Sequence, residues 1–161
     1  MSTALVLPSP NAVRAMISQL IGGNVAVKPL PGVPAHSGTS VVAVYVHDDD
    51  TPAAVWVSTV PFAASASAAL TGILPAVVEE QIRRDRLADM ILDNFRELMN
   101  VGASLFHVGQ APHTRLLGLY QVPHEPLPAG AADLMTRATA KLALHAEVDR
   151  YSEGPSWILL P

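Results

Sequence analysis

The chain has 161 residues, of which 50% are hydrophobic and 15% are charged, and its net charge at pH 7 is −4. This length is typical of one domain with a sizeable core, so we expect a single domain over residues 1–161. The lack of cysteine excludes disulfides, thiolate chemistry and cysteine-ligated metals. There is no basic patch with interleaved aromatic residues, which argues against a nucleic-acid partner. No apolar run approaches the ~18 residues of a transmembrane helix, so we expect no membrane association.

The first 30 residues predict a flexible end, a helix and a strand. The N-terminal segment lacks the basic n-region and unbroken apolar core of a signal peptide, so we expect a cytoplasmic protein with a flexible N-terminus over residues 1–9. Asn11 can cap a first helix, which Gly22 and Gly23 end. A short strand is expected over residues 24–30.

The next segments predict a β-hairpin followed by helices. Residues 40–46 and 53–60 are β-branched and apolar, and they flank a turn-forming HDDDTP sequence. Because both faces of these strands are apolar, we expect the hairpin at the centre of a sheet. A helix of small residues begins at Pro61 and is interrupted at Leu74-Pro75. The charged run of residues 79–86 is interpreted as the exposed start of the next, longer helix.

The last third of the chain predicts strands at residues 114–122, 141–149 and 156–160. Between the first two of these strands we expect a loop with a helical turn. The connections between strands have hairpin length. The element order therefore predicts an α+β fold, in which an antiparallel or mixed sheet has long helices packed on one face.

The long helix, predicted over residues 86–107, has two distinct faces. Advancing about 100° per residue places its apolar side chains on one arc and a row of polar side chains on the opposite arc. The apolar arc consists of Leu87, Ile91, Phe95, Leu98, Gly102 and Leu105, and the polar row consists of Asp93, Glu97, Asn100 and Ser104. The apolar arc must be buried, so the polar row faces water or a partner.

Three residues of the polar row form a recognisable motif. Asp93, Glu97 and Asn100 have the pattern D-x3-E-x2-N and are followed by Val-Gly-Ala. This segment resembles the (D/S)-x3-E-x2-N signature of the CheC/CheX/FliY chemotaxis phosphatases, in which a proline follows about 22 residues later. Pro123 lies 23 positions after Asn100, and the order of elements matches from about residue 11 to residue 160. Because a second E-x2-N helix is not found, the resemblance is greatest to single-site CheX-like members.

The resemblance implies a phosphatase that hydrolyses the aspartyl-phosphate of a response-regulator receiver domain in two-component signalling. Asn100 would enter the receiver's active site and orient the attacking water, and Glu97 would contact the receiver's lysine. Asp93, Arg96 and Ser104 would contribute further partner contacts. Mg²⁺ would be held by the receiver, so no cofactor or metal is expected on this chain. The resemblance also implies a homodimer formed through the sheets, for which the apolar SWILLP end is a candidate.

The residue types suit this chemistry. Phosphoryl transfer needs little covalent work from the protein, so positioning the water in line with the phosphorus is the main contribution. An amide can donate to and accept from that water without a change of charge. A helix fixes the offset between Glu97 and Asn100 at little cost in ordering entropy. Met99 stands where glycine is common in the family, and its bulk is expected to lie at the docking surface.

The sequence is also compatible with other hypotheses. The same helix could belong to a non-catalytic CheX-like protein-binding module or dimeric signalling adaptor, or it could be merely a solvated face of a structural dimer. His107, His113 and His124 have no metal-ligand spacing and are interpreted as surface or loop residues. The acidic turn of residues 48–50 lacks an EF-hand pattern, and no serine lies in a G-x-S-x-G elbow.

Overall fold

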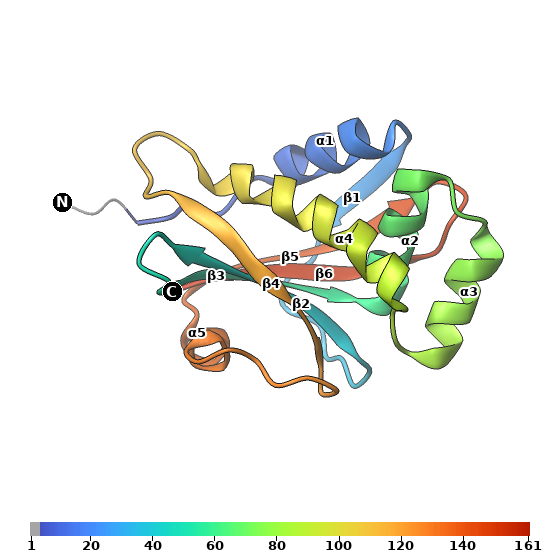
Figure 1. Cartoon of the computed structure of the whole chain (residues 1–161). Coiled ribbons are helices and arrows are strands. Elements are labelled where there is room, and N and C mark those ends of the chain that lie inside the picture. Colours follow the sequence, from blue (N-terminus) through green and yellow to red (C-terminus); the bar gives the residue numbers. More distant parts are fainter. Residues whose placement is uncertain (1–3) are drawn as a thin grey trace.

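The computed structural model describes residues 4–161, which form a six-stranded sheet covered by helices (Figure 1). Every neighbouring pair of strands is antiparallel, in the order β1-β5-β6-β3-β2-β4. The strands are β1 Val25–Pro29, β2 Ser40–His47, β3 Pro52–Thr59, β4 Thr114–Val122, β5 Ala140–Val148 and β6 Glu153–Leu160. The α+β class and the antiparallel sheet are confirmed, and the β2–β3 hairpin lies inside the sheet, as the apolar faces of its strands indicated.

The helices divide between the two faces of the sheet. They are α1 Pro10–Ile21, α2 Val60–Thr71, α3 Pro75–Arg84, α4 Asp89–Gly102 and α5 Ala131–Arg137, and a 3₁₀ turn, η1 Ala103–Phe106, extends α4. The helices α1, α2 and α4 share one core with strand residues such as Tyr45 and Trp56, which confirms the prediction of long helices on one face. The short helix α5 packs on the opposite face, where Leu134 joins Val44 and Val57 (Figure 1).

The segment between α2 and α4 differs from the prediction. The charged run of residues 79–86 is not the start of the long helix, because most of it belongs to the separate helix α3. Asp85 ends α3 in the left-handed region with φ 51°, which no continuous helix allows. The long helix therefore begins at Asp89 rather than at Arg86, and its last turn tightens to a 3₁₀ helix.

The C-terminal strand has a different position from the one that a sheet-edge dimer requires. β6 pairs with β5 on one side and with β3 on the other, so neither of its edges is free. Its apolar SWILL sequence reflects burial within the sheet, since Ile158 and Leu160 contribute to the helix-side core and Trp157 and Leu159 to the other. β6 therefore has no free edge for pairing with the sheet of a second copy, and the expected homodimer stays a prediction. The outer strands of the sheet are β1 and β4.

The ends of the described chain are packed against the sheet and its helices. Residues 4–9 have no regular secondary structure, but Leu5 and Leu7 contact the helix-side core. Residues 1–3 lie outside the described residues, and the flexibility of the N-terminus stays a prediction. Within residues 4–161, no helix has both the length and the apolar character needed to cross a membrane.

Candidate functional site

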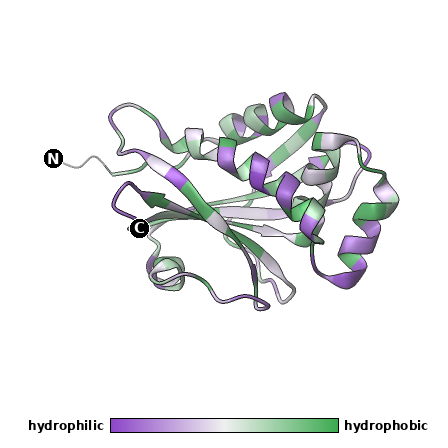
Figure 2. Ribbon diagram, in the orientation of Figure 1, coloured by the Kyte–Doolittle hydropathy of each residue, from purple (hydrophilic) through white to green (hydrophobic). Residues whose placement is uncertain are grey.

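The exposure of the polar row depends on which face of α4 packs against the rest of the domain. Its apolar arc is buried as predicted, with Ile91, Phe95 and Leu98 at most 1% exposed. The ring of Phe95 meets that of Phe62 on α2 edge to face, with centroids 6.2 Å apart. Figure 2 shows hydrophilic residues alternating with hydrophobic ones along α4, as the amphipathic pattern requires. One face of the helix is therefore committed to the core and the other is left to solvent.

Buried glutamines hold the chain just before α4. The side-chain amide of Gln121 on β4 accepts from the Leu87 N–H at 2.8 Å and donates to the Leu87 carbonyl at 2.9 Å. Gln81 on α3 accepts from the Ala88 N–H at 2.6 Å. These contacts supply hydrogen-bond partners to backbone groups of Leu87 and Ala88, in the connection between α3 and α4. The sequence signal for them was weak, because each glutamine looked like an ordinary polar residue in its own element.

The other end of α4 is held by Tyr45 and Gly102. The buried hydroxyl of Tyr45 donates to the carbonyl oxygen of Met99 at 2.7 Å. A Cβ on Gly102 would lie 3.0 Å from the ring of Trp56 and 3.1 Å from the Tyr45 hydroxyl, so only glycine allows the helix to approach the sheet this closely. Burial raises the pKa of Tyr45 far above its usual value, which keeps the hydroxyl protonated as a donor.

All four members of the predicted polar row are exposed on α4 and η1: Asp93, Glu97, Asn100 and Ser104. Asp93 forms an ion pair with Arg96 at 2.6 Å, and the Ser104 hydroxyl donates to the Val101 carbonyl at 2.7 Å. Glu97 makes no ion pair with any residue in the range 4–161. Its carboxylate is therefore available to a cation from outside the chain.

The bulk of Met99 is not at the docking surface. Its side chain is fully buried, so the expectation that it lies beside Asn100 on the outer face is wrong. Met99 is one turn after Phe95, and a helix places residues i and i+4 on the same face. The position at which glycine is common in the family that the chain resembles is a buried core position in this chain.

An open groove of about 360 Å³ runs between α4 and the edge strand β4. One wall is polar and belongs to the helix, and the other is largely apolar and belongs to the strand. The lining residues are Asp93, Arg96, Glu97, Asn100, Leu116, Leu117 and Gly118. The structure thus brings together four of the five predicted site residues, whereas Ser104 lies beyond the groove. The apolar wall was missed by sequence reasoning.

No protein-family model and no curated protein sequence matches the chain. Solved structures do match. FliY of Thermotoga maritima aligns with 95% of this chain and 84% of its own, at 12% identity and a TM-score of 0.60. The middle domain of FliM from H. pylori aligns with 94% of this chain and 84% of its own, at 10% identity and a TM-score of 0.61.

A third match comes from the complex of CheX with CheY, BeF₃ and Mg²⁺ from Borrelia burgdorferi. It covers 93% of this chain and 92% of that one, at 12% identity and a TM-score of 0.56. The chain has the fold of CheX, FliY and the FliM middle domain. The likeness covers 93–95% of the chain and concerns architecture, because the sequence identities are only 10–12%.

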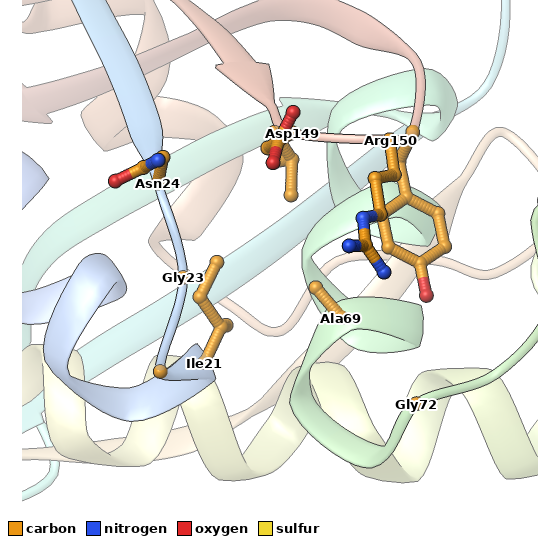
Figure 3. Close-up of a pocket in the computed structure, with 10 residues that line it drawn as sticks. Ile21, Gly23, Asn24, Ala69, Gly72, Asp149 and Arg150 are labelled. Atoms are coloured by element: carbon orange, nitrogen blue, oxygen red, sulfur yellow. The ribbon is translucent and has the colours of Figure 1, made fainter.

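Another hollow, of about 500 Å³, is not lined by α4 (Figure 3). It is bordered by the C-terminal ends of α1 and α2 and by the β5–β6 turn, where Asp149 and Arg150 lie. Arg150 adopts φ 72°, and Figure 3 shows its side chain extending toward α2. Helix C-termini carry partial negative charge, which favours the guanidinium of Arg150 beside them. The polar side chains on the lining of this hollow are those of Asn24, Asp149, Arg150 and Tyr151.

The histidines do not form a metal site. His107 and His113 stack with centroids 5.1 Å apart, and His113 contacts Asp48 at 2.7 Å, whereas His124 lies elsewhere and bonds Thr39. Within residues 4–161, no cluster of three or more His, Asp or Glu side chains is arranged to hold a metal ion. The α4–β4 groove is therefore the candidate site of this CheX-like fold.

Proposed function

We propose that the chain is a CheX-like phosphatase that hydrolyses the aspartyl-phosphate of a response-regulator receiver domain. The observation that carries the proposal is the pair Glu97 and Asn100, which lie one helical turn apart, exposed and lining an open groove, on a helix anchored at both ends. The match to a CheX in complex with CheY supports a receiver domain as the partner.

The reaction needs only a well-placed water. The water oxygen attacks the phosphorus and forms a new P–O bond, while the bond between phosphorus and the aspartyl oxygen breaks. The leaving group departs as a carboxylate and needs no proton, and the two water hydrogens remain on the dihydrogen phosphate that forms. The Asn100 amide orients the water in line with the leaving oxygen, which is the main contribution a protein can make to phosphoryl transfer.

Glu97 orients the partner and takes no part in the chemical step. Asp93 pairs with Arg96, which leaves Glu97 as the uncompensated carboxylate of the groove. A carboxylate aimed at a partner ammonium guides docking and register more than it increases affinity. Mg²⁺ is usually bound by one or two carboxylates together with waters and substrate phosphates, and we assign any Mg²⁺ in the reaction to the receiver, which carries the phosphoryl group.

A non-catalytic binding module is the second candidate. The observation that favours it is the apolar wall formed by Leu116 and Leu117, since apolar surface contributes to affinity and not to hydrolysis. The FliM middle domain shares the fold with CheX, so the architecture alone does not assign catalysis. A homodimer that pairs sheet edges would use β1 or β4, and sedimentation velocity tests whether such a dimer forms.

The deciding experiment measures phosphate release from a phosphorylated receiver domain with wild type and with Asn100→Ala. We expect the stimulated rate to fall on the order of 100-fold, the scale of losing one transition-state hydrogen-bonding group. Asn11→Ala removes an exposed amide from α1 and is the matched control, expected to retain full activity. Equal rates for wild type and Asn100→Ala would reject catalysis. Receiver binding without any stimulated release would establish the binding module.

A further inference from the structure

We propose that Leu117 is the apolar anchor that seats the receiver domain on the α4–β4 groove. The inference rests on the proposed function for the identity of the partner, and it adds an apolar contact to the polar pair Glu97 and Asn100. Its starting point is an irregularity in the pairing of β2 with β4. Val44 pairs with Gly118 and Tyr45 with Leu116, so Leu117 is an extra residue that opposes none on β2.

This bulge changes the direction of the side chains along β4. In a regular strand, residues three positions apart point to opposite faces. Here Leu116 packs against the helix-side core and Leu119 belongs to it, which is possible because the bulge adds one residue between them. Bulges re-aim side chains and are frequent beside functional sites. Leu117 is 41% exposed and lines the groove across from the polar wall of α4.

Within residues 4–161, Leu117 packs against neither of the two hydrophobic cores. β4 is an outer strand of the sheet, and an exposed leucine on such an edge favours unwanted association. The neighbouring exposed residue, Arg115, is ion-paired with Asp50 and follows the usual protection of an edge by charge. Leu117 departs from that pattern at the point where β4 borders the groove, which indicates a contact surface.

Charge and polarity define the partner that fits. The α4 wall offers one unpaired carboxylate, Glu97, beside the Asn100 amide, and the β4 wall offers Leu117 and Leu116. The complementary surface has a cation next to an apolar patch on a folded domain. A receiver domain supplies the cation through the lysine beside its phosphorylation site, and the proposal places an apolar surface of that domain on Leu117. Leu117 would then fix the partner's position while Asn100 reaches the phosphoryl group.

The test measures the affinity of a CheY-type receiver domain loaded with BeF₃⁻ and Mg²⁺ for wild type, Leu117→Ser and Leu117→Asp, by calorimetry. Leu117 is partly exposed on an edge bulge, so the variants are expected to fold, and circular dichroism and thermal unfolding check this. We expect about a tenfold weaker affinity for Leu117→Ser, as is typical of an interface anchor, and a larger loss for Leu117→Asp. Leu74→Ser is the matched control, because Leu74 is 71% exposed and does not line the groove.

A kinetic comparison separates anchoring from chemistry. Leu117→Ser should mainly raise the KM for phosphorylated receiver, whereas Asn100→Ala should mainly lower kcat. Normal affinity of both Leu117 variants, with activity lost in Asn100→Ala, overturns the anchor and leaves the proposed function standing. Weaker binding by the Leu117 variants, with no phosphate release by wild type, supports the anchor and removes the phosphatase.

Two further outcomes overturn the anchor. If wild type binds no loaded receiver, both the anchor and the proposed function fail. If the Leu117 variants bind receiver normally but change the sedimentation of the protein alone, the occupant of the groove edge is a second copy of this chain.

Discussion

The hydroxyl of Tyr45 and the carbonyl oxygen of Met99 are joined by a buried hydrogen bond of 2.7 Å, directly before Asn100 in the chain. At this point α4 tightens into a 3₁₀ turn, and the Ala103 N–H points to the carbonyl of Asn100. The tyrosine thus supplies a donor from β2 to the backbone of the helix that carries the proposed water-orienting amide. The depth of α4 against the sheet is set by a residue more than fifty positions away.

Replacement of Tyr45 by phenylalanine removes this bond with little change in volume. We expect Tyr45→Phe to lower the free energy of unfolding by about 1–2 kcal/mol, because a buried carbonyl loses its donor. Urea denaturation followed by circular dichroism measures the change. The proposed phosphatase activity should also fall, since the C-terminal half of α4 is less firmly placed. An unchanged unfolding midpoint would show that the bond does not hold the helix.

The raised pKa of Tyr45 predicts an alkaline loss of stability that depends on this residue. Below pH ~10 the hydroxyl is protonated in the folded and the unfolded chain, so the contribution is fully present. As the pH rises above that value, only the unfolded chain loses the proton, and the free energy of unfolding falls by up to about 1.4 kcal/mol per pH unit. Denaturation between pH 9 and 11, a window placed around the usual tyrosine pKa of ~10, should show a steeper decline for wild type than for Tyr45→Phe.

Gly102→Ala tests the close approach of α4 to the sheet. The new Cβ would lie 3.0 Å from the Trp56 ring and 3.1 Å from the Tyr45 hydroxyl, both fully buried. We expect a loss of about 1–3 kcal/mol from overpacking, although alanine is intrinsically the better helix former. Gly23→Ala is the control, because a Cβ at that residue would have no neighbouring atom within 4 Å. Equal thermal stability of the two variants would contradict the proposed crowding.

Gln121→Leu tests the anchor at the other end of α4. The change leaves the N–H and the carbonyl of Leu87 without their side-chain partners in a buried setting. We expect a loss of about 3 kcal/mol in the free energy of unfolding, because two desolvated backbone groups become unsatisfied. Gln110→Leu changes an exposed glutamine in the same way and should have little effect. Comparable losses in the two variants would argue against a specific role for Gln121.

Asp93→Ala tests whether Asp93 neutralises the positive charge of Arg96 beside Glu97. The Asp93–Arg96 pair is exposed, so its removal should change stability by less than about 0.5 kcal/mol. The released guanidinium would instead oppose a cationic partner, and we expect receiver affinity at low salt to fall about threefold. The additional change Arg96→Ala should restore it. If the double variant binds as weakly as the single one, Asp93 itself contacts the partner.

Local sequence patterns predicted the α+β class, the central hairpin and the two faces of α4. Spacing along a helix is a local property, so Phe95 and Leu98 were placed in the core and Glu97 and Asn100 outside it without knowledge of the fold. The burial of Met99 could also be predicted from the sequence, because Met99 lies four residues after Phe95 on the same helix face. The boundary between α3 and α4 could not be predicted in this way. Asp85 ends α3 in the left-handed conformation, and Gln121, on a distant strand, holds the connection through hydrogen bonds.

The sequence by itself determined which side chains share a helix face, because the periodicity of the backbone imposes that relationship wherever the helix forms. Only the tertiary structure decided that SWILL is a central strand and that β4 borders the polar row. It also decided that Leu117 bulges toward the groove. Strand order and register depend on pairing between segments far apart in the chain, which no local pattern encodes.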